Sequence, residues 1–133
     1  MKLHMADKKL RIAWSSNAPY CTSGYGVQTS EIVFRMRKAG YPVACINFYG
    51  QEGGKFALND VVMYPKMFSA WGEDALLEHG KDFKSDVSFT LQDIWTMNPQ
   101  ICSQLKKWVA YLPIDHEPVP RIILERARLA YRL

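Results

Sequence analysis

The sequence has no apolar run that approaches the roughly 18 residues a helix needs to cross a membrane. Its start, MKLHMADKKL, also lacks the apolar segment of a secretory signal peptide. We therefore expect a protein with no integral membrane segment. Residues 1–9 are interpreted as an N-terminal extension, part of which resembles vector-derived sequence, and residues 10–133 as the folded domain.

Cysteine and histidine are scarce. Cys21, Cys45 and Cys102 are an odd number of widely spaced residues without a C-x-x-C pair, which argues against a disulfide framework and against a zinc knuckle. We expect three reduced thiols in a cytoplasmic protein. The three histidines form no H-x-H or H-E-x-x-H motif, so the sequence predicts no metal site and no tightly bound cofactor.

A strong excess of one charge is also missing. Lysine and arginine together number 17, and aspartate and glutamate 13, which gives a net charge of +4 spread along the chain. A mild positive field suits an anionic small molecule such as a nucleotide, and it does not require a nucleic acid. An ordinary solvated surface is the alternative explanation.

What the sequence does contain is a regular alternation of apolar runs and amphipathic segments. Apolar runs at 10–14, 41–50, 60–65, 85–93 and 108–115 predict strands, while 27–40, part of 71–83, 98–108 and 120–133 predict helices. Strands that alternate with helices indicate an α/β fold, here a Rossmann-like parallel sheet with helices on both faces in a single domain.

Polar residues gather after the predicted strands. Ligands of an open parallel sheet bind beyond the carboxyl ends of its strands, so these loops are the candidate site. The candidates in the loop after the first strand are Asn17, Ser23, Gly24, Tyr25 and Gly26.

The stretch SGYG within that loop precedes a predicted helix. Its two glycines permit positive φ and let a backbone approach an anion closely, and the N–H groups of the helix point to the same place. The dinucleotide fingerprint G-x-G-x-x-G is incomplete, because Thr29 occupies the third glycine position, and no G-K-[ST] motif is present. A simple turn and a phosphate cradle both remain open.

The later loops carry ionisable and aromatic candidates. Asp93 follows one buried strand, and Asp115 and His116 follow the next, where a carboxylate must be solvated or paired. A helix cap for Asp93, a turn for Asp115 and a structural role for His116 are the alternatives to catalysis. Tyr25 and Trp95 are suited to stacking on a sugar or a base.

Three segments resemble the N-terminal domain of group 1 glycosyltransferases of the GT-B class. The first is RIAWSSNAPYCTSGYGVQTSEIVFRMRKAGYPVACI, and the others are DVSFTLQDIW and WVAYLPIDHEPVP. They occur in the family's order and cover most of residues 10–125.

The resemblance implies an acceptor-side domain of a glycosyltransferase that moves a sugar from a nucleotide-sugar donor to an acceptor glycan or another hydroxyl acceptor. Ser23, Gly24 and Gly26 would then reach the donor diphosphate or the acceptor, and Asp93, Asp115 and His116 would line the cleft. Asp93 stands where relatives commonly carry histidine, which puts the identity of any base in doubt. In retaining members the leaving diphosphate is thought to accept the proton.

The family's C-terminal donor domain has no counterpart in these 133 residues. We therefore expect the parent protein to continue past Leu133, this chain alone to be inactive, and apolar surface beside the missing domain to promote a homo-oligomer. A stand-alone nucleotide- or phosphate-binding module and a non-catalytic interaction domain are the alternative functions.

Overall fold

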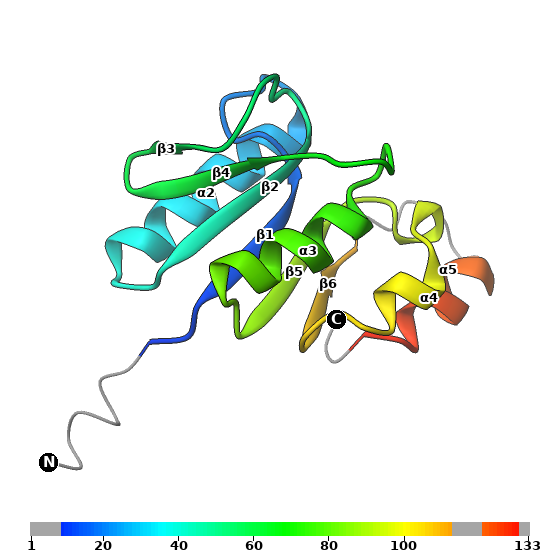
Figure 1. The fold of residues 1–133 in the computed structure, drawn as a ribbon. Helices are drawn as coiled ribbons and strands as arrows, with labels where there is room; N and C mark the ends of the chain where they lie inside the picture. Colours follow the sequence, from blue (N-terminus) through cyan, green and yellow to red (C-terminus); the bar gives the residue numbers. More distant parts are fainter. Residues whose placement is uncertain (1–8, 113–120, 131–133) are drawn as a thin grey trace, which may run out of the picture.

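A computed structural model describes residues 9–112 and 121–130, and Figure 1 shows the arrangement of their elements. The strands are β1 (Ile12–Asn17), β2 (Val43–Tyr49), β3 (Phe56–Leu58), β4 (Val61–Pro65), β5 (Val87–Leu91) and β6 (Trp108–Tyr111). The helices are α2 (Gly24–Lys38), α3 (Glu73–Phe83), α4 (Pro99–Cys102) and α5 (Arg121–Ala127), with a 3-10 turn η1 (Ile94–Thr96).

The described strands form one sheet in the order β3-β4-β2-β1-β5-β6. All neighbouring pairs are parallel except β3 and β4, which form an antiparallel hairpin. Asn59 and Asp60 both have positive φ at its turn, as two-residue hairpin turns require. The predicted α/β class with a mainly parallel sheet is therefore confirmed, with an antiparallel strand added at one side.

The two faces of the sheet bury different side chains, because successive residues of a strand point to opposite faces. Trp14 packs with Val33 of α2 on one face, whereas Ala13 belongs to the core that contains Leu76 of α3 and Ile123 of α5. Figure 1 shows α2 and α3 on opposite sides of the sheet. Helices thus cover both faces, as the sequence predicts.

Buried indole groups in both cores have hydrogen-bond partners. Trp14 Nε1 donates to Thr29 Oγ1 at 3.1 Å, and Trp108 Nε1 donates to Thr90 Oγ1 at 2.8 Å. A buried donor without a partner costs free energy, so these two bonds fix the indoles in the core. Both tryptophans are therefore structural residues.

Several boundaries differ from the prediction. β1 continues through two buried serines to Asn17, and α2 begins at Gly24, so SGYG lies at the start of the helix and not in a loop. α3 continues past Gly80 to Phe83, and α5 ends at Ala127. The 3-residue strand β3 is absent from the predicted strands, because three residues are too few to show alternation.

No helix in the described ranges is both long enough and apolar enough to pass through a membrane.

Candidate functional site

The candidate site lies where the chain leaves the neighbouring strands β1 and β5. From β1 the chain passes through α2 to β2 on one side, whereas β5 and β6 lie on the other side. The carboxyl ends of the parallel strands form one edge of the sheet, which we call the carboxyl edge. Asn17 is the last residue of β1, and Asp93 follows the end of β5. Both lie at this edge, where open α/β sheets bind ligands.

Ser23 organises the loop that follows β1. Its Oγ accepts a hydrogen bond from the N–H of Gly26 at 3.1 Å, which makes Ser23 the N-cap of α2. The same Oγ accepts from Asn17 Nδ2 at 2.7 Å. Asn17 and Ser23 therefore fix the start of α2 against the end of β1, which is a structural function for two predicted ligand-binding residues.

The two glycines of SGYG have different surroundings. A Cβ on Gly26 would lie 2.4 Å from Cys21 O and 3.0 Å from Ala18 O, so this glycine lets α2 pack directly against the preceding loop. A Cβ on Gly24 would meet no protein atom within 4 Å, and neither glycine has positive φ. Gly26 is thus required for packing, while the space beside Gly24 is open to a ligand.

Tyr25 and Asp93 come together from distant parts of the chain. Tyr25 Oη donates to Asp93 Oδ1 at 3.3 Å across the gap between α2 and the end of β5. Asp93 precedes η1, but its side chain makes no capping bond to that turn, so the carboxylate remains exposed and faces Tyr25. The structure therefore brings two predicted site residues into contact. The alternative for Asp93, a helix cap or a hydrogen bond within the loop, is met only by its bond to Tyr25, because its side chain caps no helix.

Two exposed tryptophans belong to segments at the carboxyl edge, and the ring of Trp71 contacts Phe48 of β2, with the ring centres 6.2 Å apart. Trp95, in η1, is 49% exposed, and Trp71, in the loop before α3, is 45% exposed. Gln92 Nε2 donates to Trp71 O at 3.0 Å, which ties the Trp71 loop to the end of β5. The sequence indicates Trp95 but not Trp71, because only the tertiary fold brings the loop after β4 beside the end of β5.

Buried polar atoms without a hydrogen-bond partner are concentrated near this edge. Among the described residues these atoms include Ser15 Oγ on β1, Gln92 Oε1 after β5 and Glu73 Oε1 at the start of α3. The other carboxylate oxygen of Glu73 accepts from the N–H of Asn98 at 2.6 Å. Buried polar atoms normally have a partner, so this edge can bind a polar molecule or ordered water.

Tyr20, in the loop after β1, has a perturbed phenol. Partial burial raises its pKa, and the nearby thiols of Cys21 and Cys45 raise it further. An ordinary tyrosine is already neutral at physiological pH, and the raised pKa extends the neutral range of this phenol, a hydrogen-bond donor, to higher pH. Burial also raises the pKa of Cys45 itself, so its thiol is not a nucleophile.

Two predicted residues, Asp115 and His116, lie outside the described residues. Within residues 9–112 and 121–130, no group of three or more histidine, cysteine, aspartate or glutamate side chains could hold a metal ion. The assembled part of the site is therefore the contact between Tyr25 and Asp93, the open space at Gly24, and the exposed rings of Trp71 and Trp95.

Comparisons with protein-family models, with curated proteins and with solved structures find no match for this chain.

Proposed function

We propose that this chain is the acceptor-side domain of a GT-B glycosyltransferase, which places an acceptor hydroxyl opposite a nucleotide-sugar donor. The observation that carries the proposal is the contact between Tyr25 and Asp93 at the carboxyl edge, between the first and fourth parallel strands. The carboxylate accepts a hydrogen bond from the acceptor hydroxyl and orients it, while Tyr25 holds the carboxylate in place.

The order of the strands supports a Rossmann-like fold. If β3 is left out, the parallel strands numbered along the chain lie in the order 3-2-1-4-5, with the reversal between β1 and β5. These are the first five positions of the doubly wound order 3-2-1-4-5-6, and ligands of that fold bind at the reversal. Asn17 and Asp93 lie at that position.

The residue types at the carboxyl edge favour the acceptor over the donor diphosphate. Residues 17–23 and 92–98 contain no lysine or arginine, which are the usual partners of a diphosphate. The half-exposed rings of Trp71 and Trp95 offer apolar faces at this edge, and the Asp93 carboxylate offers a hydrogen-bond acceptor; both suit a hydroxyl-rich ring. The donor diphosphate would then be held mainly by a second domain.

In the proposed glycosyl transfer, this domain has to orient the acceptor hydroxyl. The acceptor oxygen forms a bond to the anomeric carbon of the donor sugar, the bond to the diphosphate breaks, and the acceptor proton leaves. Asp93 can accept that proton, or it passes to the leaving diphosphate if the configuration is retained. In the first case Asp93 is the general base, and in the second it orients the hydroxyl. In both cases its loss should lower turnover more than donor binding.

The test uses the full-length protein that contains this chain and measures the release of nucleoside diphosphate from a panel of nucleotide sugars. We expect Asp93→Asn to lower kcat/KM by about 100-fold and Tyr25→Phe by about tenfold. Asp60→Asn is the control, because Asp60 is an exposed carboxylate in the turn before β4, at the opposite edge of the sheet, and asparagine tolerates its positive φ. Unchanged turnover in Asp93→Asn would exclude the proposed site, and no release with any donor would exclude the proposed reaction.

A stand-alone nucleotide-binding module is the second candidate, and the open space at the first residue of α2 favours it. The N–H groups of a helix N-terminus attract phosphate, and Gly24 leaves the approach free. Calorimetric titration of this chain with nucleotides would then show binding that Gly24→Val abolishes. A Gly24→Val variant that binds nucleotide as well as the wild type would exclude this candidate.

A further inference from the structure

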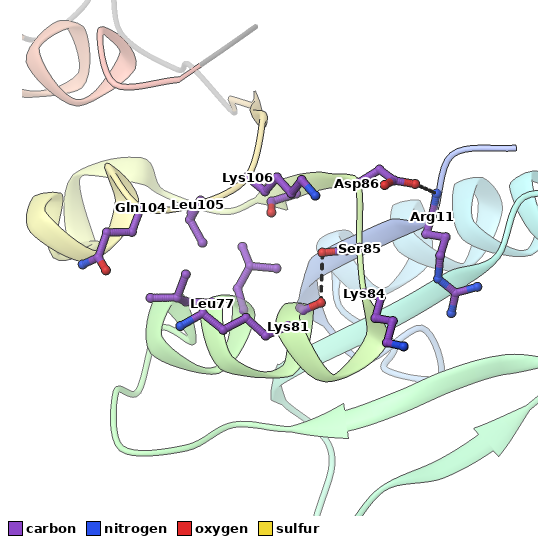
Figure 2. A pocket seen from close by; sticks show the side chains of 12 residues that line it. Arg11, Leu77, Lys81, Lys84, Ser85, Asp86, Gln104, Leu105 and Lys106 are labelled. Atoms are coloured by element: carbon purple, nitrogen blue, oxygen red, sulfur yellow. Dashed lines mark hydrogen bonds between the residues drawn. The ribbon is translucent and has the colours of Figure 1, made fainter.

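A separate cavity of about 710 Å³ lies at the opposite edge of the sheet. The parallel strands begin at this edge, which we call the amino edge. It is bounded by the C-terminal half of α3 and by the segment that joins α4 to β6 (Figure 2). Its volume falls within the range of small-molecule sites, about 300 to 1,000 Å³. None of its lining residues belongs to the candidate site described above.

The inner wall of this cavity is apolar. Leu76 and Leu77 come from α3, and Leu105 comes from the segment before β6; Figure 2 shows Leu77 and Leu105 on opposite sides of the space. Leu76 and Leu105 are 1% and 8% exposed, so they belong to the core and form a rigid floor. An apolar chain or ring placed here would remove the remaining leucine surface from water.

The rim of the cavity is basic. The lining contains the cations Arg11, Lys81, Lys84 and Lys106 and a single anion, Asp86, which gives the lining a net charge of +3. Asp86 already accepts a hydrogen bond from the N–H of Arg11 at 2.8 Å. The cavity therefore favours an anionic ligand.

Two of the four cations are committed to other groups. Arg11 Nε donates to Phe83 O at 2.9 Å, and its guanidinium lies 4.2 Å from the centre of the Phe83 ring. Lys81 Nζ pairs with Glu78 at 3.3 Å. Arg11 and Lys81 thus stabilise the end of α3.

The end of α3 does not need the other two lysines. The N–H of Ser85 donates to Gly80 O at 2.9 Å, and the N–H of Lys84 donates to Lys81 O at 3.1 Å, so these carbonyls have backbone partners. Over the described residues, the ammonium groups of Lys84 and Lys106 have neither an ion pair nor a hydrogen bond. Both are free to bind an anion at the rim.

We propose that this cavity binds a small amphiphilic anion. An apolar chain or ring lies against the leucine wall, and a phosphate or carboxylate group at the rim is held by Lys84 and Lys106. The site is distinct from the acceptor site, because the two lie at opposite ends of β1, a distance of about 20 Å for a strand of this length.

The test titrates the chain with octyl phosphate below its micelle concentration by isothermal calorimetry. We expect Lys84→Gln and Lys106→Gln together to weaken binding at least about tenfold, since each removes a charged hydrogen bond. Lys38→Gln is the matched control, because Lys38 is exposed at the end of α2 on the other face of the sheet. Equal affinity in the double variant and the wild type would overturn the proposal.

Further arms separate the sources of the anion. Inorganic phosphate and octyl glucoside, which carry only one half of the ligand, should each bind at least tenfold more weakly than octyl phosphate. Binding of inorganic phosphate with equal affinity would overturn the amphiphilic ligand in favour of a simple anion site. Binding only to vesicles that contain phosphatidate, and not to the monomer, would overturn the cavity as the site.

The single variant Lys106→Gln separates a loss of binding from a loss of folding. Lys84 has a positive φ at the end of α3, so its replacement can alter the helix end, whereas Lys106 lies outside any helix. Lys106→Gln with a wild-type melting temperature and unchanged affinity would count against the proposal. The same variant with wild-type stability and weakened binding would support it.

Discussion

The carboxyl edge and the amino edge of the sheet are formed by the same strands, yet they differ in charge and in hydrogen bonding. At the carboxyl edge, buried polar atoms such as Ser15 Oγ and Gln92 Oε1 have no partner among the described residues. At the amino edge, the carbonyls of Gly80, Lys81 and Phe83 at the end of α3 have donors, and lysines surround an apolar cavity.

This difference follows from the direction of the chain in a parallel sheet. Helix N-termini lie at the carboxyl edge, where side chains such as Ser23 cap them, and helix C-termini lie at the amino edge, where cations are favourable. The edge with unpaired polar atoms and exposed rings suits a neutral polar ligand. The edge with free cations suits an anion.

The largest effect should come from the tightest contact at the carboxyl edge. Gly26→Ala places a Cβ 2.4 Å from Cys21 O, so the loop after β1 must move away from α2. We expect the free energy of unfolding to fall by about 1 to 3 kcal/mol, measured by urea denaturation. Gly24→Ala is the control and should be neutral or stabilising, because nothing lies within 4 Å of the added atom. Equal losses in both variants would contradict the described packing.

A smaller loss should follow from removing the cap of α2. Ser23→Ala deletes the acceptor for the N–H of Gly26 and for Asn17 Nδ2, which should cost about 1 kcal/mol in the free energy of unfolding. Thr22→Ala changes the exposed neighbouring residue and should have little effect. If both variants unfold at the same urea concentration as the wild type, Ser23 does not cap the helix.

A polar cluster away from both edges provides a reference with paired groups. Tyr64 Oη donates to Asp82 Oδ2 at 2.6 Å, and Lys55 Nζ lies 3.2 Å from the same oxygen. Burial and the hydrogen bond to Asp82 raise the pKa of Tyr64. The pKa of Asp82 is lowered by the hydrogen bond from Tyr64 and by the nearby Lys55.

The sign of each shift determines the pH dependence. A raised tyrosine pKa contributes stability below the ordinary value of 10.0, and this contribution is lost as the pH rises through the higher folded value. The lowered pKa of Asp82 contributes stability above 3.8 that is lost in acid. Tyr64→Phe should therefore have a lower melting temperature at pH 7 and a flatter decline above pH 10. Parallel declines of the two proteins would contradict this assignment.

The smallest change in the free energy of unfolding should follow from removing a hydroxyl that has no hydrogen-bond partner. Ser15→Ala removes a buried Oγ that has no partner, so the free energy of unfolding should change by less than about 0.5 kcal/mol. Ser16→Ala is the matched control on the same strand, because Ser16 Oγ donates to Leu91 O at 2.7 Å and should cost about 1 kcal/mol. A loss of more than about 1 kcal/mol in Ser15→Ala would show that this hydroxyl has a bound partner.

The sequence predicts the elements that have strong local signals. The apolar run that became β2 is correct, and so is the start of the helix predicted over 98–108, where Asn98 Oδ1 accepts from the N–H of Gln100 at 2.9 Å. The predicted length of that helix is wrong, because α4 ends at Cys102. The extension of β1 through Ser15 and Ser16 could not be predicted, because polar side chains give no strand signal without their neighbours on β2 and β5.

The candidate site was predicted in part. Asn17, Ser23, Tyr25 and Asp93 do lie at the carboxyl edge, because strand ends in a parallel sheet meet there. The different roles of Gly24 and Gly26 were not predictable, since they depend on where the backbone of Cys21 lies. The amino-edge cavity was missed because its four cations come from three separate segments, at Arg11, at the end of α3 and at Lys106.

The bonds that join β1 to β5 have a consequence for how the molecule acquires its structure. Arg11 N–H to Asp86 and Ser16 Oγ to Leu91 O each connect residues 75 positions apart, whereas β3 and β4 are joined by a two-residue turn. Contacts of large sequence separation carry a larger entropy of closure and form late in folding. We expect the hairpin to form early, and both edges to mature together in the step that aligns β1 with β5.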